Sequence, residues 1–128
     1  MRDLLVLALA GAAGTLSRYA LSGWAYRLFG VGFPYGTLAV NVIGCFLVGL
    51  LMEVTVTTEL LPAAWRLPLA VGFLGAFTTF STFGFETFQY LVDGAWGPAL
   101  SNIGANLLLG VGATWIGFVA ARGFFGGV

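Results

Sequence analysis

Phenylalanine and hydroxyl side chains alternate densely in residues 72–86, which read GFLGAFTTFSTFGFE. Hydroxyl groups can donate hydrogen bonds to an anion, and they can also satisfy backbone groups that an interrupted helix releases. A phenyl ring carries a positive edge, which attracts an anion weakly. The stretch also contains Gly72, Gly75 and Gly84, which give the backbone room to leave helical geometry. These residues predict a membrane-spanning segment broken near its middle, with a functional site at the break.

The composition places this stretch in a lipid bilayer. Of the 128 residues, 59% are hydrophobic and only 8% are charged, and the mean hydropathy is +0.99. A soluble domain of this size carries roughly a quarter charged residues. Since a spanning helix needs about 20 apolar residues, the length fits four spans in an integral membrane protein.

Four apolar runs predict an all-α membrane protein with four transmembrane helices, the third of them broken mid-membrane. We expect a single four-helix transmembrane domain over residues 1–128, with helices at about 4–29, 34–57, 66–92 and 99–121. The turn before the fourth helix is expected to comprise Asp93, Gly94, Gly97 and Pro98, because Asp, Gly and Pro favour turns.

Residue types argue against several classes of function. The chain has no histidine, the commonest general base, and no carboxylate pair at hydrolytic spacing within an apolar run, so we expect no enzyme. Its formal net charge is zero, which argues against a nucleic-acid partner. The single cysteine, Cys45, lies in an apolar run, where a buried and inert thiol is expected.

An amide lies within the second apolar run. Thr37, Asn41 and Cys45 are spaced four residues apart, so they share one face of a helix. A buried amide must find hydrogen-bond partners. Two roles stay open for Asn41: it joins helices by hydrogen bonds, or it lines a polar path.

An arginine lies well inside the first apolar run. Arg18 occupies the C-terminal half of this run, where a charge is costly. It either snorkels to the interface beside Tyr19 or faces an aqueous vestibule lined by protein.

Small and polar residues recur at every fourth position of the fourth run. This stripe comprises Asn102, Asn106, Gly110 and Thr114. Such a stripe is typical of a close-packing seam between helices, and its two asparagines also fit a hydrated path.

The predicted break has two chemical consequences. Carbonyl groups released near residues 75–78 can coordinate a hard cation such as Na⁺, as at other broken membrane helices. Beyond the break, Thr79, Thr82 and Glu86 follow the spacing of one helical face. A polar stripe therefore leads from the break towards an aqueous mouth.

Two phenylalanines follow the break one helical turn apart, Phe80 and Phe83. They either pack in the core or against lipid, or they turn their ring edges into a common space. In the second case a small anion can cross a narrow path lined by ring edges and hydroxyl donors. A fixed cation is then unnecessary, and it would trap the ion.

The arginines leave the orientation in the membrane undecided. One side receives the termini and the second connection, with Arg2, Arg66 and Arg122. The other side has Arg27, so the positive-inside bias is weak. A chain balanced in this way can insert in both orientations, which permits an antiparallel dimer.

Three segments resemble a known family. Residues 72–87, GFLGAFTTFSTFGFET, closely resemble the signature of the small bacterial fluoride channels, the Fluc or CrcB family. GTLAVN at 36–41 and GAAGTLSRY at 11–19 are also similar, at corresponding positions. The resemblance covers all four apolar runs, and TTFSTF with an upstream GTLxVN is highly specific.

The resemblance implies a fluoride channel that exports F⁻ passively from the cytoplasm, relieves fluoride toxicity and resides as a multi-pass protein in the bacterial cytoplasmic (inner) membrane. It further implies a dual-topology homodimer with two antiparallel pores. A structural Na⁺ at the dimer interface would be held by the backbone carbonyls of Gly75 and Thr78. The positions that match the family's fluoride pathway are Phe80, Phe83, Asn41, Thr37, Ser81, Thr82, Glu86 and Thr114.

The match to the family is incomplete in the fourth run. Many relatives carry Tyr where Asn102 stands, and Ser where Asn106 and Gly110 stand, so this part of the path is expected to differ. The alternative function is a small four-helix drug/proton antiporter, which needs a carboxylate deep within a helix. The first run has none, and Glu53 and Glu86 lie nearer the ends of their runs.

Overall fold

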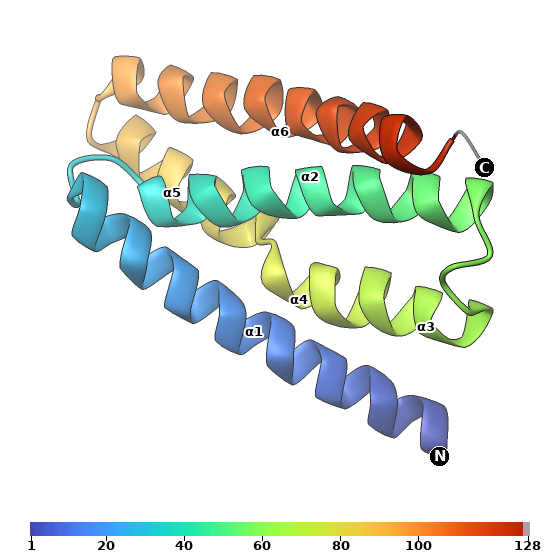
Figure 1. Cartoon of the computed structure of the whole chain (residues 1–128). Helices are drawn as coiled ribbons and strands as arrows, with labels where there is room; N and C mark the ends of the chain where they lie inside the picture. Colours follow the sequence, from blue (N-terminus) through green and yellow to red (C-terminus); the bar gives the residue numbers. More distant parts are fainter. Residues whose placement is uncertain (127–128) are drawn as a thin grey trace.

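Helices account for nearly all of residues 1–126, the part of the chain that the computed structural model describes. In chain order they are α1 (Arg2–Phe29), α2 (Tyr35–Thr57), α3 (Ala63–Leu67), the π-helix η1 (Pro68–Leu74), α4 (Gly75–Phe77), α5 (Phe80–Val92) and α6 (Trp96–Phe125) (Figure 1). Four stretches are long and apolar enough to cross a membrane, and the third, Ala63–Val92, combines α3, η1, α4 and α5. The predicted all-α architecture with four spans and a broken third helix is confirmed.

The third and fourth spans begin earlier than expected. The third starts at Ala63, directly after Pro62, which occupies the N-cap position. The predicted turn is present at Asp93 and Gly94, but the fourth span starts at Trp96, so the extension of this turn through Gly97 and Pro98 is wrong. Pro98 occupies the first turn of α6, where its missing N–H has no helical partner to lose.

The second and fourth spans pack side by side, α2 against α6 (Figure 1). Glycines bring their backbones together: a Cβ at Gly49 would overlap the carbonyl of Thr114, and one at Gly117 would overlap that of Phe46. Small residues permit such an approach in a membrane, where lipid provides no hydrophobic drive for association. The fourth-run stripe is therefore a packing seam along this part of α6.

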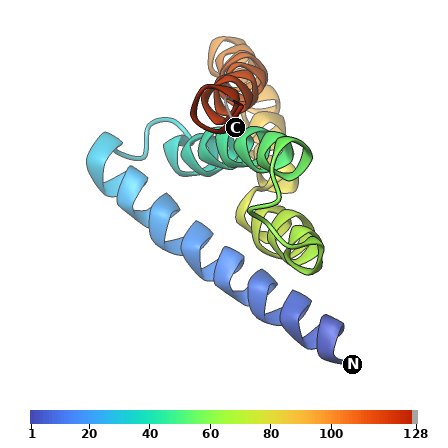
Figure 2. The same ribbon diagram turned by 45° about the vertical axis from the view of Figure 1, so that its right-hand side comes forward.

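The first span leans away from the others. α1 packs on η1, α4 and α2, and its N-terminal half splays outwards in both views (Figures 1 and 2). At the crossing with the third span, a Cβ at Gly14 would overlap the carbonyl of Phe73. Large apolar side chains such as Leu9 and Leu16 are exposed along α1. This helix thus presents a broad apolar surface to its surroundings.

An ion pair joins α2 to the end of α6. Nε of Arg122 lies 3.0 Å from Oε1 of Glu53, and the guanidinium carbon of Arg122 lies 5.0 Å from the centre of the Phe118 ring. Glu53 is buried. Because a buried carboxylate is costly without a counter-ion, this pair ties the two helix ends together.

The third span changes its backbone geometry twice before α5. Pro68 lacks the N–H that would bond the carbonyl four residues earlier, and the chain continues as the wider π-helix η1. α4 then ends, and Thr78 and Thr79 are extended, with φ/ψ of −84°/160° and −149°/104°. α5 begins at Phe80. These two threonines form the break in the span.

Glycine does not create the break, contrary to expectation. Gly75 keeps helical dihedral angles, φ −63° and ψ −36°, and no glycine in residues 72–86 has a positive φ. Gly72 instead allows close packing, because a Cβ there would lie 2.9 Å from Cβ of Ala10 on α1. The extended residues are β-branched threonines, which favour extended backbone.

Candidate functional site

The first turn of α5 is capped by the break itself. The hydroxyl of Thr79 accepts a hydrogen bond from the backbone N–H of Thr82 at 3.3 Å, which is the usual N-cap arrangement. The same hydroxyl donates to Oγ1 of Thr82 at 2.8 Å and lies 3.5 Å from Oγ of Ser81. Thr79 is buried, whereas Ser81 and Thr82 are exposed. The hydroxyl run therefore stabilises the helix start and leaves two hydroxyl residues on its outer face.

The side chain of Asn41 pairs with the main chain of the broken helix. Its Oδ1 accepts a hydrogen bond from the N–H of Thr79 at 2.8 Å, and its Nδ2 donates to the carbonyl of Thr79 at 3.2 Å. The amide thus bonds both backbone groups of one extended residue, much as a neighbouring strand does. Of the two roles that the sequence left open for Asn41, the structure shows the first: its side chain joins α2 to the third span by hydrogen bonds.

Amide side chains extend this pairing into α6. Nδ2 of Asn41 also donates to Oδ1 of Asn106 at 3.0 Å. Nδ2 of Asn106 donates to the carbonyl and to Oδ1 of Asn102, each at 3.0 Å, and Nδ2 of Asn102 donates to Oγ1 of Thr87 at 3.0 Å. Asn102 is fully buried. Sequence reasoning left both α6 asparagines outside the proposed pathway, although their four-residue spacing indicated a common face.

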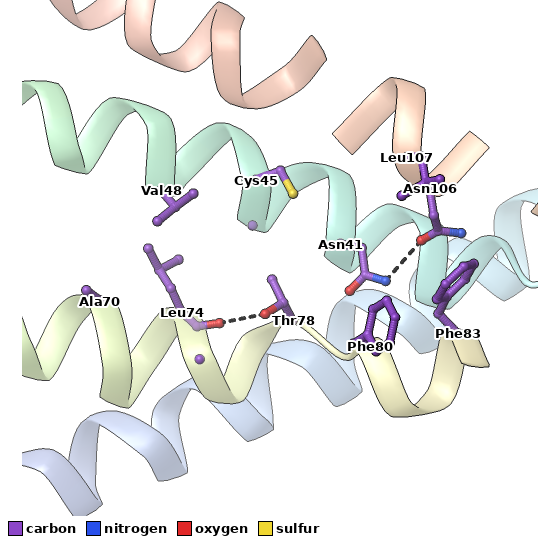
Figure 3. Close-up of a pocket in the computed structure, with 12 residues that line it drawn as sticks. Asn41, Cys45, Val48, Ala70, Leu74, Thr78, Phe80, Phe83, Asn106 and Leu107 are labelled. Carbon is purple, nitrogen blue, oxygen red and sulfur yellow. Dashed lines mark hydrogen bonds between the residues drawn. The ribbon is translucent and has the colours of Figure 1, made fainter. Parts of the chain in front are cut away.

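A cavity of about 340 Å³ lies beside the break, between α2, the two halves of the third span and α6 (Figure 3). Asn41, Thr78 and Asn106 contribute polar side chains to its wall, and Phe80 and Phe83 contribute rings. No charged side chain lines it in the part of the chain that the structure describes. The cavity is therefore uncharged and mostly apolar, with a few hydrogen-bonding groups near the break.

The two phenylalanines predicted to act together are neighbours. The ring centres of Phe80 and Phe83 lie 5.4 Å apart, and the ring planes are tilted by 55°. Phe83 is 8% exposed, whereas Phe80 is 80% exposed in the single chain. Phe83 is thus held by the protein, and Phe80 projects from the open side of the cavity.

A second polar pair lies about one turn further from the break. Oγ1 of Thr37 donates to Oε1 of Glu86 at 2.6 Å. Glu86 lines a separate cavity of about 270 Å³ together with Tyr26, Tyr90 and Asp93. This cavity lies where α1 ends and α2 begins. Glu86 therefore lies in a cavity separate from that of the phenylalanine pair, and its place at an aqueous mouth stays a prediction.

Arg18 lies against the break. Its Nη1 donates to the carbonyl of Thr78 at 3.4 Å, and the side chain is half-buried. This contact draws the guanidinium towards a released backbone carbonyl. It lines neither of the two cavities described above, so its vestibule role stays a prediction.

Thr114 is separated from the other predicted pathway residues. It lies eight residues beyond Asn106 on α6, which corresponds to about 12 Å along a helix. Its hydroxyl donates to the carbonyl of Gly110 at 3.1 Å, and it lines a different cavity with Gly49 and Trp115. Within the single chain, the structure does not bring Thr114 to the break.

Backbone oxygens are the candidate ligands for a cation. Within residues 1–126, no three His, Cys, Asp or Glu side chains gather to hold a metal. Gly75 and Thr78 both line the cavity at the break. The N–H of Thr79, which would bond the Gly75 carbonyl in an unbroken helix, donates to Asn41 instead. The Thr78 carbonyl accepts only the long bond from Arg18 and retains a second lone pair. These oxygens suit a hard monovalent cation.

A helix interrupted within the membrane, whose released groups are satisfied by side chains and whose break lines a cavity, defines a class of multi-pass membrane proteins that conduct or carry ions. The chain belongs to the CrcB family. The family model described as CrcB-like protein, Camphor Resistance (CrcB), matches residues 5–118. The resemblance seen in the sequence is therefore confirmed.

Curated relatives match nearly the whole chain. The fluoride-specific ion channel FluC of Geobacter metallireducens is 50% identical over 122 residues, which cover 95% of this chain and 98% of the relative. The FluC of Citrifermentans bemidjiense is 51% identical over the same shares. The FluC of Pelobacter propionicus is 48% identical over 127 residues, or 99% of this chain and 98% of the relative. With four apolar spans, this relationship identifies a multi-pass bacterial membrane protein and not an enzyme.

Removal of the Thr79 hydroxyl should destabilise the start of α5. Thr79→Val keeps the shape of the side chain but loses the cap, so the free energy of unfolding should fall by about 0.5–2 kcal/mol. Thermal unfolding of the purified protein in detergent measures this loss. Thr55→Val is the matched control, because its hydroxyl bonds only a carbonyl three residues earlier in its own helix. Equal losses in both variants would contradict the capping role.

Proposed function

We propose that this chain forms a fluoride-selective ion channel, through which F⁻ leaves the cytoplasm passively and fluoride toxicity is relieved. The observation that carries the proposal is the phenylalanine pair, 5.4 Å between ring centres, beside amide and hydroxyl groups in a cavity without charge. Relatives at about 50% identity are fluoride-specific ion channels by name, which supports fluoride as the ion. Because neutral HF enters cells and dissociates at cytoplasmic pH, a passive path for F⁻ suffices for export.

The wall of the cavity can replace water around a small anion. One N–H group of Asn41 and the hydroxyl of Thr78, which donates to the Leu74 carbonyl at 3.1 Å, are neutral donors at this wall, and the edges of Phe80 and Phe83 carry partial positive charge. Conduction needs a site that binds well enough to admit the ion and weakly enough to release it. Neutral donors and ring edges meet both demands, whereas a cationic side chain within the path would hold F⁻ too tightly.

A proton-coupled antiporter is disfavoured by the positions of the carboxylates. Glu53 is paired with Arg122 at the end of α6, and Glu86 accepts a hydrogen bond from Thr37 near the mouth. Neither lines the cavity at the break. An antiporter needs a carboxylate within that central cavity to exchange protons for its substrate.

Reconstitution into liposomes tests the proposed function. Proteoliposomes loaded with fluoride should release it rapidly when a potassium ionophore balances the charge, and chloride-loaded vesicles should release almost none. Phe80→Ile and Phe83→Ile keep bulk and hydrophobicity but remove the ring edges. We expect a large loss of fluoride flux in each variant, with assembly unchanged by size-exclusion chromatography.

A packing role for these rings predicts a different result. A hydrophobic exchange of similar volume then costs about 1 kcal/mol of stability and leaves flux nearly intact. Wild-type flux in both folded variants would remove the ring edges from the mechanism. Fluoride release no faster than from protein-free vesicles would exclude the channel itself.

We further propose that the channel is an antiparallel homodimer of chains inserted in both orientations. Phe80, Ser81 and Thr82 are all exposed on the single chain, and Phe80 also lines the cavity, whose wall a second copy would complete. The weak arginine bias between the two sides fits dual insertion. In this arrangement Phe80 of one chain meets the ring pair of its partner.

Charges added to one end of the chain test dual insertion. Several lysines appended to the C-terminus should bias insertion to one orientation, since cationic residues stay on the cytoplasmic side. This variant should lose fluoride flux when expressed alone. Co-expression with a variant that carries lysines in the first loop should restore flux. Full activity from a population with a single orientation would exclude the antiparallel dimer.

We also propose a structural Na⁺ at the break, held by the carbonyls of Gly75 and Thr78 from both chains. The support is the loss of the helical donor to Gly75 and the free lone pair on Thr78. A hard cation coordinated by backbone oxygens would join the two broken helices without depending on any side chain.

Prolonged sodium removal tests this proposal. Exchange of Na⁺ for a large organic cation should lower both fluoride flux and thermal stability, and added Na⁺ should restore them. Thr78→Ser is the matched control, because it keeps the carbonyl and should bind radioactive sodium like the wild type. The channel should transport no sodium. Unchanged stability and no bound sodium after purification in Na⁺ would overturn the assignment.

A further inference from the structure

The Asn41 amide uses its two N–H groups for different partners. Its Oδ1 accepts from the N–H of Thr79 at 2.8 Å, and Nδ2 donates to the Thr79 carbonyl at 3.2 Å. The same nitrogen donates to Oδ1 of Asn106 at 3.0 Å. Since a side-chain amide has two N–H groups, one serves the break and the other serves Asn106.

The pair with Thr79 determines which way the Asn41 amide points. A flipped amide would place its NH₂ against the Thr79 N–H and its oxygen against the Thr79 carbonyl, so both bonds would be lost. The orientation of Asn41 therefore does not depend on Asn106. The second N–H can change partners without disturbing the break.

This second N–H lies at the wall of the cavity. Figure 3 shows the bond between Asn41 and Asn106 beside the rings of Phe80 and Phe83, and all four residues line the same cavity. Among the partners of Asn41, Asn106 alone is a side chain, and it lies on a separate helix.

Hydrogen bonds on α6 and α5 hold Asn106 with its oxygen towards Asn41. Its Nδ2 donates to the carbonyl and to Oδ1 of Asn102, each at 3.0 Å. Asn102 donates to Thr87 at 3.0 Å, and Thr87 donates to the carbonyl of Phe83 at 2.8 Å. In this series of hydrogen bonds, from Asn106 through Asn102 and Thr87 to Phe83, every donor points away from Asn41. Asn106 therefore cannot turn its NH₂ to Asn41 without breaking bonds to Asn102.

We propose that Oδ1 of Asn106 is the resting acceptor for the second N–H of Asn41, and that fluoride displaces this oxygen as it passes Phe80 and Phe83. The inference rests on the proposed function. Asn106 then acts as a specificity-determining residue, because an ion must be a better hydrogen-bond acceptor than an amide oxygen to take its place. Fluoride meets this condition, and the larger, weaker acceptor chloride does not. The competition also keeps fluoride from binding too tightly.

Removal of the competing oxygen provides the test. Asn106→Leu keeps a similar volume without an acceptor, so the half-saturating fluoride concentration for efflux should fall by about fivefold, the equivalent of one ordinary hydrogen bond. Efflux rates over a range of fluoride concentrations measure it. Ser101→Ala, an exposed position on α6, is the control and should match the wild type. An unchanged or raised half-saturating concentration in a folded Asn106→Leu dimer would overturn the inference.

Asn106→Asp provides a second test that does not depend on a bulky replacement. A protonated carboxyl has an acceptor for Asn41 and a donor for Asn102, so it copies the amide. An ionised carboxylate is a stronger acceptor and repels fluoride. As pH rises, flux through this variant should fall and its half-saturating concentration should rise, relative to the wild type at the same pH and after subtraction of HF leakage. The same pH profile as the wild type would overturn the inference. If Asn106→Leu fails to assemble, Asn106→Asp serves as the deciding test.

Different results would overturn the proposed function and the role of Asn106. Absence of fluoride flux through the wild-type chain overturns the proposed function and this inference with it. Normal wild-type flux, together with an Asn106→Leu variant that saturates like the wild type, overturns the role of Asn106 alone.

Discussion

The pairing between the Asn41 amide and the main chain of Thr79 is the interaction on which the third span depends. In hydrocarbon an unpaired N–H or carbonyl is very costly, so an extended backbone survives there only where other groups replace the lost helical bonds. Asn41 bonds both groups of Thr79, and the Thr79 hydroxyl caps the helix that follows. The position of α2 therefore determines where the third span can be broken.

The break also explains why the site is polar but uncharged. Because the Thr79 N–H bonds Asn41, the carbonyl of Gly75, a residue that lines the cavity, loses its helical donor, and Phe80 and Phe83 occupy the first turn of a new helix. Asn106, on the fourth span, adds a hydrogen-bond acceptor at the same depth. Three helices thus supply one layer of neutral donors, acceptors and rings, without a buried charge that would need a counter-ion.

Local properties of the sequence were sufficient to predict the four spans and the break, because hydropathy and the density of hydroxyl residues are read along the chain. The cause of the break could not be predicted in this way, since Gly72 serves close packing and Thr79 is held by Asn41, 38 residues away. Helical spacing put Asn106 and Thr114 on one face of α6. It does not encode depth or partners, so only the tertiary structure shows that Asn106 meets Asn41 while Thr114 packs against Gly49.

The ion pair between Glu53 and Arg122 bears on the order of events during synthesis. The carboxylate leaves the ribosome 69 residues before its partner, so for most of translation the end of α2 has no counter-ion. The glycine seam between α2 and α6 is incomplete over the same period. The second span therefore reaches its final packing against α6 only after α6 has also entered the bilayer.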